Sequence, residues 1–180
     1  MSCKKVTDLN TQAELAMKAA GYYSKKTAGA KIAIDATQSL MEEAMRKIPI
    51  SNFVRFADFG SADGGTSQEL WFNLIKSFRD RGDTRPLEIL YTDLASNDFS
   101  TLFRSMQGMG ENSDLAYQER FKDVYVHACG TGFHSQLMRK GTLSLGFSAT
   151  AMHYVSEKPC QILDHVHMVG ASEIEREKFE

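Results

Sequence analysis

The fold of this chain follows from one stretch, Phe53-Val-Arg-Phe-Ala-Asp-Phe-Gly-Ser-Ala-Asp-Gly-Gly-Thr-Ser67. Its first half is a short apolar run, which predicts a buried strand. Its second half holds three glycines, which let a backbone turn sharply and approach a ligand because they have no Cβ atom. A helix is expected next, capped by Thr66 with Glu69 completing a capping box. Strand, glycine turn and helix are typical of nucleotide-binding units in open α/β sheets, whose ligands lie at the carboxyl ends of the strands.

The residues of the turn favour some ligands over others. No Lys follows the glycines, so this is not a phosphate loop of the Walker type, and Gly60-Ser-Ala-Asp-Gly64 lacks the middle glycine of the dinucleotide motif. The carboxylates of Asp58 and Asp63 repel a pyrophosphate but suit a cationic or hydroxyl-rich ligand. S-adenosylmethionine (SAM) has an ammonium, a sulfonium and a ribose diol. Another nucleotide, or a structural corner without a ligand, is still open at this point.

Length and composition narrow the class of protein. A chain of 180 residues with 42% hydrophobic and 24% charged residues is about the size and make-up of one globular domain. A net charge of −2 gives no electrostatic case for nucleic acid, and no apolar run approaches membrane-spanning length. The three cysteines, Cys3, Cys129 and Cys160, lack zinc-ligand spacing and are typical of free thiols in a reducing compartment. Polar residues near the N-terminus argue against an ordinary signal peptide, so we expect a cytoplasmic protein.

Helices and strands are expected to alternate along the chain. Apolar spacing predicts helices at 31–47 and 68–81, and one that Ser96 or Asn97 caps and Gly108 ends. A short helix is also expected at 11–20, ended by Gly21, and an acidic helix at 172–180. Further strands are expected at 87–93, 123–128 and 142–148. Such alternation indicates a mostly parallel sheet with right-handed crossovers.

Two details of this pattern bear on the site. In the helix 31–47 an apolar stripe recurs at helical spacing and is expected to face the core; its members are Ile32, Ala33, Ala36, Leu40, Ala44 and Ile48. Asp93 ends the second strand, where an acid accepts hydrogen bonds from a ribose diol in nucleotide-binding units. The alternative for Asp93 is a helix-capping or loop aspartate.

Four blocks of the sequence resemble the SABATH family of SAM-dependent methyltransferases, which act on plant carboxylic acids and on nitrogen atoms in caffeine synthesis. Ala57-Asp-Phe-Gly-Ser-Ala-Asp-Gly-Gly-Thr66 resembles the family's first SAM motif, and Tyr91-Thr-Asp-Leu-Ala-Ser-Asn-Asp-Phe-Ser100 is similar to its N-D-L-P-G-N-D-F-N block. Gly132-Phe-His-Ser-Gln-Leu137 and the stretch 143–156 are similar to two later blocks. The resemblance implies a class I methyltransferase fold, a Rossmann-like, mostly parallel α/β sheet with flanking helices.

The resemblance also implies which residues hold SAM. Asp58 and Gly60 would contact its methionine end, with Ser61 and Asp63 in the same turn. Asp93 and Leu94 would hold the ribose and the adenine edge, and Gly132 and Phe133 would lie against the adenine. Tyr23 and Thr27 would close the site around SAM and substrate, while Thr150, His153 and Tyr154 would contact the substrate. The segment 1–49 would then be a helical segment closing over a SAM-binding domain at 50–180.

The chain departs from the family in two respects. Ala30 stands where the plant enzymes have a Gln that binds the substrate carboxylate, Tyr154 replaces a Trp, and Thr150 replaces a bulkier aromatic residue. Family members are also much longer, so we expect a partial domain that lacks the helical cap and later strands.

Two functions follow from these observations. The leading one is a SAM-dependent methyltransferase acting on a small-molecule carboxylic acid. Because a carboxylate is already ionised near neutral pH, the expected task of the protein is alignment and exclusion of water, without a catalytic residue. The alternative is an inactive SAM-binding or partner-binding fragment, whose exposed sheet edge would favour association, for example as a homodimer. No metal is expected, although His165 and His167 share one face if they lie on a strand.

Overall fold

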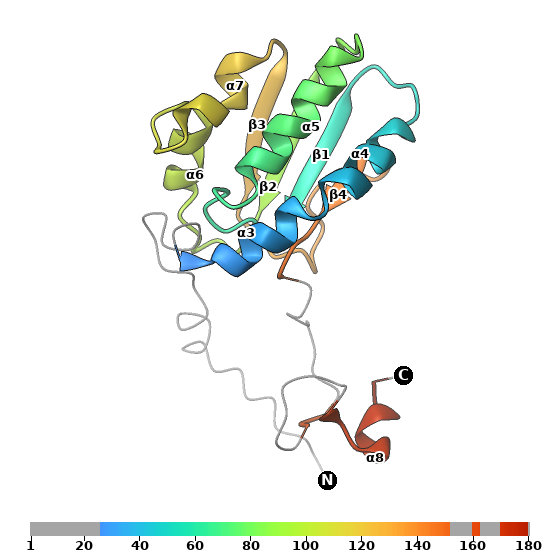
Figure 1. The fold of residues 1–180 in the computed structure, drawn as a ribbon. Coiled ribbons are helices and arrows are strands. Elements are labelled where there is room, and N and C mark those ends of the chain that lie inside the picture. The colour runs from blue at the N-terminus through green and yellow to red at the C-terminus, as the bar shows by residue number, and fades with distance from the viewer. Residues whose placement is uncertain (1–25, 152–159, 163–169, 180) are drawn as a thin grey trace.

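A computed structural model describes residues 26–151, 160–162 and 170–179 (Figure 1). The helix expected at 11–20 and the pair His165 and His167 lie outside the described residues. In chain order the elements are α3 (Ala28–Asp35), α4 (Gln38–Arg46), β1 (Val54–Phe59), α5 (Gln68–Asp80), β2 (Leu87–Thr92), α6 (Phe99–Met106), the 3₁₀ helix η1 (Ser113–Leu115), α7 (Tyr117–Arg120), β3 (Val124–Cys129), β4 (Leu145–Phe147) and α8 (Glu173–Arg176). Each of the four expected strands is present, within one to three residues of its expected bounds.

The four strands form one parallel sheet in the order β3-β2-β1-β4. Six residues of β1 pair with β2, so that Asp58 lies opposite Tyr91 and Phe59 opposite Thr92. The parallel pairing of all four strands confirms the predicted α/β class and its mostly parallel sheet. Because parallel strands end at the same edge of a sheet, the turns after β1, β2 and β4 meet there.

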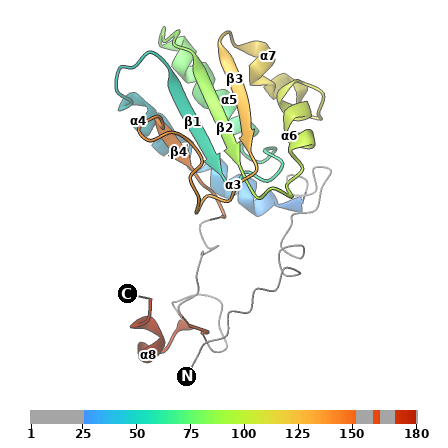
Figure 2. The ribbon, with the colours of Figure 1, turned by 180° about the vertical axis from the view of Figure 1, so that it is seen from behind.

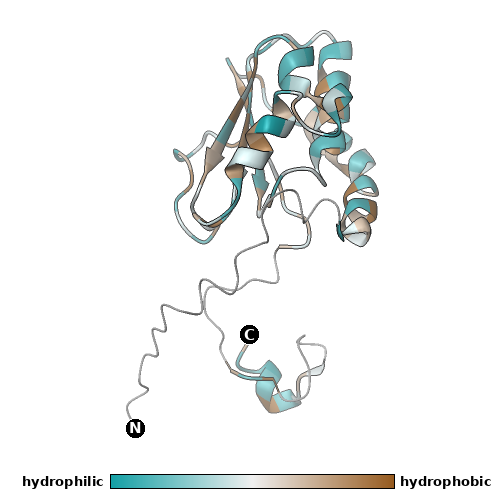
Figure 3. Ribbon diagram, turned by 90° about the vertical axis from the view of Figure 1, so that its left-hand side faces the viewer, coloured by the Kyte–Doolittle hydropathy of each residue, from teal (hydrophilic) through white to brown (hydrophobic). Residues whose placement is uncertain are grey.

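The main apolar core lies between the sheet and α5. Val54 and Phe56 of β1 are fully buried, and the Phe56 ring stacks on Trp71 of α5 with 5.4 Å between ring centroids. Phe147 of β4 meets the same indole edge-on at 6.0 Å. Figure 3 shows the brown, apolar strands on one side and the helices packed against them on the other.

The described helices from α3 to α7 lie on one side of the sheet, so the other side is bare in the described part of the chain (Figure 2). The connection from β3 to β4, which would cross that side, contains no helix. The bare side carries an ion pair between Arg55 and Glu88 at 2.6 Å and the half-exposed ring of Tyr125. Parallel sheets are usually covered on both faces, whereas the described residues leave this face open.

The expected core face of the helix 31–47 is wrong at Ile32, Ala33, Ala36 and Leu40, which are exposed, whereas Ile48 packs against the core. Ile32 is 70% exposed and Leu40 is 67% exposed, whereas Ile34, Met41 and Met45 are buried. The helix is divided into α3 and α4 because the backbone N–H and the hydroxyl of Thr37 both donate to the carbonyl of Ile34, at 2.9 and 2.7 Å. This tighter turn interrupts the regular α-helical spacing from which the core-facing stripe was predicted.

Two expected helix caps are also wrong. Ser67 is the residue before α5, and its side chain makes no cap hydrogen bond. Glu69 instead accepts a 2.7 Å hydrogen bond from Lys31 of α3. Asp98 caps α6 by accepting the N–H of Thr101 at 3.1 Å, because its carboxylate lies one residue nearer the helix than Asn97.

Candidate functional site

The turn after β1 requires glycine at position 60 for two reasons. Gly60 has φ +74°, which is rarely adopted by residues with a side chain, and a Cβ atom there would lie 2.5 Å from the Cβ of Ala151. The N–H groups of Gly60 and Ser61 both donate to the carbonyl of Thr92, at 2.9 and 3.1 Å. The turn is therefore fixed to the end of β2 and closely approached by the chain that follows β4.

Asp58 is the acid at the end of β1, and it is 3% exposed. It lies on the α5 side of the sheet, where its Oδ2 accepts the hydroxyl of Ser67 at 2.6 Å and the indole N–H of Trp71 at 3.0 Å. Burial raises the pKa of Asp58 to about 6, and the nearby carboxylate of Asp93 adds to this rise, while the two hydrogen bonds oppose it. A cationic ligand group would favour the ionised form.

Asp93 directly follows β2 and anchors both turns at the carboxyl edge of the sheet. Its Oδ2 accepts the N–H of Ala62 at 2.7 Å, and its Oδ1 accepts the N–H of Leu94 at 2.7 Å. The amide of Asn97 donates to the carbonyl of Ala62 at 2.7 Å. Ala62 is thereby held at φ 49°, and the turns after β1 and β2 form one hydrogen-bonded unit.

Ser61 and Asp63 complete the turn and are both buried. The Ser61 hydroxyl lies 3.4 Å from the carbonyl of Thr92, and Asp63 Oδ1 accepts the N–H of Gly65 at 3.1 Å. Within the turn these two side chains bond to backbone groups. They shape the turn whether or not they also contact a ligand.

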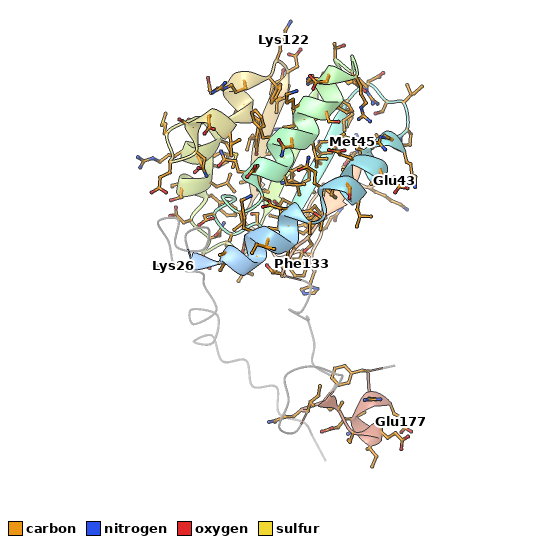
Figure 4. The ribbon with its side chains drawn as sticks, viewed as in Figure 1. Lys26, Glu43, Met45, Lys122, Phe133 and Glu177 are labelled. Carbon is orange, nitrogen blue, oxygen red and sulfur yellow. The ribbon has the colours of Figure 1, made fainter. Side chains whose placement is uncertain are left out.

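Leu94, Gly132 and Phe133 come together beside the turn. A Cβ on Gly132 would lie 3.6 Å from Leu94 Cδ2, and a Cβ on Gly60 would lie 3.7 Å from the Phe133 ring. Leu94 is 44% exposed, so it offers an apolar surface at this edge. Figure 4 shows Phe133 and Lys26 at the same end of the domain and Lys122, before β3, at the opposite end.

The remaining sequence-predicted residues are placed only in part. Thr27 directly precedes α3, and Thr150 is exposed with φ 55° next to Ala151. Tyr23, His153 and Tyr154 lie outside the described residues. The structure therefore brings together the expected cofactor residues from the three strand ends, and it places Thr150 beside the turn.

Sequence reasoning missed four residues that organise this site. Ser67 and Trp71 bind Asp58, Asn97 binds Ala62, and Ala151 approaches Gly60. A signal was available for Trp71, because a buried indole N–H needs an acceptor and Asp58 lies on a neighbouring element. Contacts of Ala151 and Asn97 depend on tertiary geometry, which spacing does not give.

The arrangement has the chemistry of a site for a cationic, hydroxyl-bearing ligand. Two carboxylates stand at the ends of adjacent parallel strands, and an apolar surface lies beside them. No group of three or more His, Cys, Asp or Glu side chains is close enough to hold a metal ion within the described ranges. No helix among these ranges has both the length and the apolarity of a transmembrane span.

Curated proteins and a solved structure resemble this chain. A probable 7-methylxanthine methyltransferase 5 from Theobroma cacao is 31% identical over 131 residues, which are 69% of this chain and 34% of the relative. A loganic acid O-methyltransferase from Catharanthus roseus is 23% identical over 156 residues, covering 79% of this chain and 38% of the relative. The solved structure of a loganic acid methyltransferase with SAH matches with a TM-score of 0.61 at 21% identity, over 80% of this chain and 41% of its own.

These matches show the fold of the chain, the share of its relatives' length that it covers, and its family. The solved structure confirms the class I methyltransferase fold. The chain spans between about a third and two fifths of the length of these proteins. The model of the family described as SAM dependent carboxyl methyltransferase matches residues 16–177. The expected SABATH resemblance is thus confirmed, and the chain belongs to the SAM-dependent carboxyl methyltransferase family.

Proposed function

We propose that this chain forms the SAM-binding part of a methyltransferase that acts on the carboxylate of a small-molecule acid. The observation that carries the proposal is the pair of carboxylates, Asp58 and Asp93, at the ends of adjacent parallel strands around a turn that admits only glycine at position 60. Membership of a SAM-dependent family supports the choice of SAM over other cationic nucleotides.

The residues present fit the parts of SAM. Asp58 would accept a hydrogen bond from the ammonium of the methionine end. Asp93 lies where the ribose diol would bind, although backbone N–H groups already occupy both of its oxygens, so the diol would share them. Leu94, Gly132 and Phe133 would supply the surface for adenine. SAM contributes the activated methyl group on its sulfonium.

The task of the chain is then orientation rather than acid–base catalysis. A carboxylate is ionised near neutral pH and needs no base. Holding the reacting atoms in line can lower the barrier by roughly 7–11 kcal/mol when the geometry is near attack. Thr150, three residues after β4, would contact the substrate together with Tyr23, His153 and Tyr154, and Thr27, directly before α3, would help to close the site around SAM. The free Cys129 and Cys160 fit a reducing compartment, which supports a cytoplasmic location.

Calorimetric titration of SAM and of SAH into the chain tests the proposal. Asp58→Asn keeps the shape of the side chain while removing its charge, and it should weaken binding of both ligands at least tenfold at pH 7.5. Asp114→Asn, in η1, is the matched charge control and should bind like the unmodified chain. Equal affinity in all three proteins would contradict the site assignment.

A second candidate is a SAM-binding module that acts with another polypeptide, and the bare face of the sheet favours it. Tyr125 and Leu143 are 48% and 43% exposed in the described part of the chain. A second copy is the simplest partner, giving a homodimer. Light scattering after size-exclusion chromatography tests for this homodimer, because a monomer at all concentrations argues against self-association through this face.

A further inference from the structure

The only tryptophan of the chain is connected directly to the proposed cofactor carboxylate. Trp71 is fully buried, stacked on Phe56 and edge-on to Phe147. Its indole N–H donates to Asp58 Oδ2 at 3.0 Å. An apolar core could be filled by phenylalanine at position 71 as well as by tryptophan. The indole N–H is therefore the part of this side chain with a separate task.

Ser67 shows the same preference for Asp58. It stands at the N-cap position of α5, where a hydroxyl normally accepts an N–H of the first turn. Here it makes no cap hydrogen bond and instead donates to Asp58 Oδ2 at 2.6 Å. A helix cap is lost so that the carboxylate gains a donor.

Both donors reach the same oxygen, which leaves the other one for a ligand. No hydrogen bond from the described residues reaches Asp58 Oδ1. Thr92 Oγ1 is the one fully buried side-chain oxygen or nitrogen without a partner in this part of the chain, so Oδ1 is not sealed inside the protein. Oδ1 therefore marks the oxygen with which Asp58 meets the site.

The surroundings of Asp58 oppose its negative charge apart from these two donors. Asp93 lies close enough to repel this charge. Burial raises the pKa of the hydroxyls of Tyr91 in β2 and Tyr117 in α7, and the charge of Asp58 in turn helps to raise it. The two tyrosines hydrogen-bond to each other rather than to Asp58. The groups that stabilise the ionised carboxylate are therefore Ser67 and Trp71.

We propose that Ser67 and Trp71 are positioning residues for the cofactor: they hold Asp58 ionised through Oδ2 and direct Oδ1 towards the ammonium of SAM. This inference rests on the proposed function for its ligand, but the state of the carboxylate can be measured without one. Burial alone raises the pKa of Asp58, and loss of either donor raises it further. Trp71→Phe removes the N–H and keeps an aromatic ring in the core. Ser67→Ala removes the hydroxyl.

The test is the pH dependence of SAM binding between pH 5 and pH 8.5. Affinity in the unmodified chain should fall as pH drops through about 6, where Asp58 takes up a proton. Trp71→Phe and Ser67→Ala should each move this midpoint up by about one pH unit, so that they bind about fivefold more weakly at pH 6, about tenfold more weakly at pH 5 and almost normally at pH 8.5. Ser67→Thr should restore the midpoint, and Ser77→Ala, on the same helix, should leave it unchanged. Equal weakening at every pH, or an unmoved midpoint, overturns the inference.

Tryptophan emission gives the second measurement. Because Trp71 is the single tryptophan and touches Asp58, its emission in the free protein should titrate near pH 6, and Asp58→Asn should abolish this titration. If SAM fails to bind at any pH while the emission titrates, the proposed function fails and the arrangement of Asp58 stands. If the emission shows no step that Asp58→Asn removes, the inference itself is overturned.

Discussion

Replacement of Gly60 by alanine tests the close approach on which the site depends. The left-handed backbone at φ +74° costs a residue with a Cβ about 1–2 kcal/mol. The new Cβ would also lie 2.5 Å from the Cβ of Ala151, well inside the usual carbon–carbon separation of about 3.5–4.0 Å. Relieving such an overlap costs about 1–3 kcal/mol. Gly60→Ala should therefore lower the free energy of unfolding by about 2–5 kcal/mol.

Gly82 provides the matched control for this experiment. It has φ +81° and nothing within 4 Å of a Cβ, so Gly82→Ala carries the backbone cost without the overlap. Urea unfolding of both variants, followed by circular dichroism, isolates the steric part as their difference. Adding Ala151→Gly to Gly60→Ala should recover that difference. Equal losses in the two single variants, or no recovery in the double variant, would refute the packing of Ala151 on the turn.

Three further predictions concern single interactions. The pKa of Asp58 is about 6 in the folded chain against an ordinary 3.8, so between these values the folded state holds a proton that the unfolded chain has lost, and this group lowers stability as pH rises. Urea unfolding of Asp58→Asn should therefore show a gain of about 2–3 kcal/mol at pH 7 and almost none at pH 3.5; no difference at pH 7 would count against burial of the charge. Asp98→Ala removes the cap of α6 and should cost about 1 kcal/mol, while Asp98→Asn should cost less; equal costs would contradict the cap. A double-mutant cycle on Lys31 and Glu69, whose side chains are 34% and 47% exposed, should give a coupling of only about 0.2–1 kcal/mol, and a value above about 2 kcal/mol would contradict this exposure of the pair.

The strands could be predicted because their signal is local. Each strand is a short apolar run bounded by Gly, Pro or polar residues, and the acid that ends β2 is visible in the sequence as Asp93. The helices could be placed but not oriented. In α3 and α4, Ile32 and Leu40 are as apolar as Ile34 and Met41, and spacing alone could not say which side meets α5.

The polar contacts of the site were harder to predict for a related reason. Glu69 had a local option in a capping box with Thr66, and Ser67 had one as the N-cap of α5, yet Glu69 pairs with Lys31 and Ser67 with Asp58. Local rules rank the choices within a segment, whereas these side chains took partners from other elements. The ligand roles implied for all the site residues stay predictions, and Tyr23, His153 and Tyr154 also lie outside the described residues.

The short strand β4 has a consequence for how the domain folds and opens. Ser144 and Ser148, on either side of it, bond to residues of β1 that lie 89 positions earlier in the chain. Closing so long a loop costs entropy, and only three residue pairs offset it, against six between β1 and β2. β4 should therefore form after the rest of the sheet and exchange its amide hydrogens fastest among the strands. Each such opening would carry Ala151 away from Gly60 and briefly expose the turn after β1.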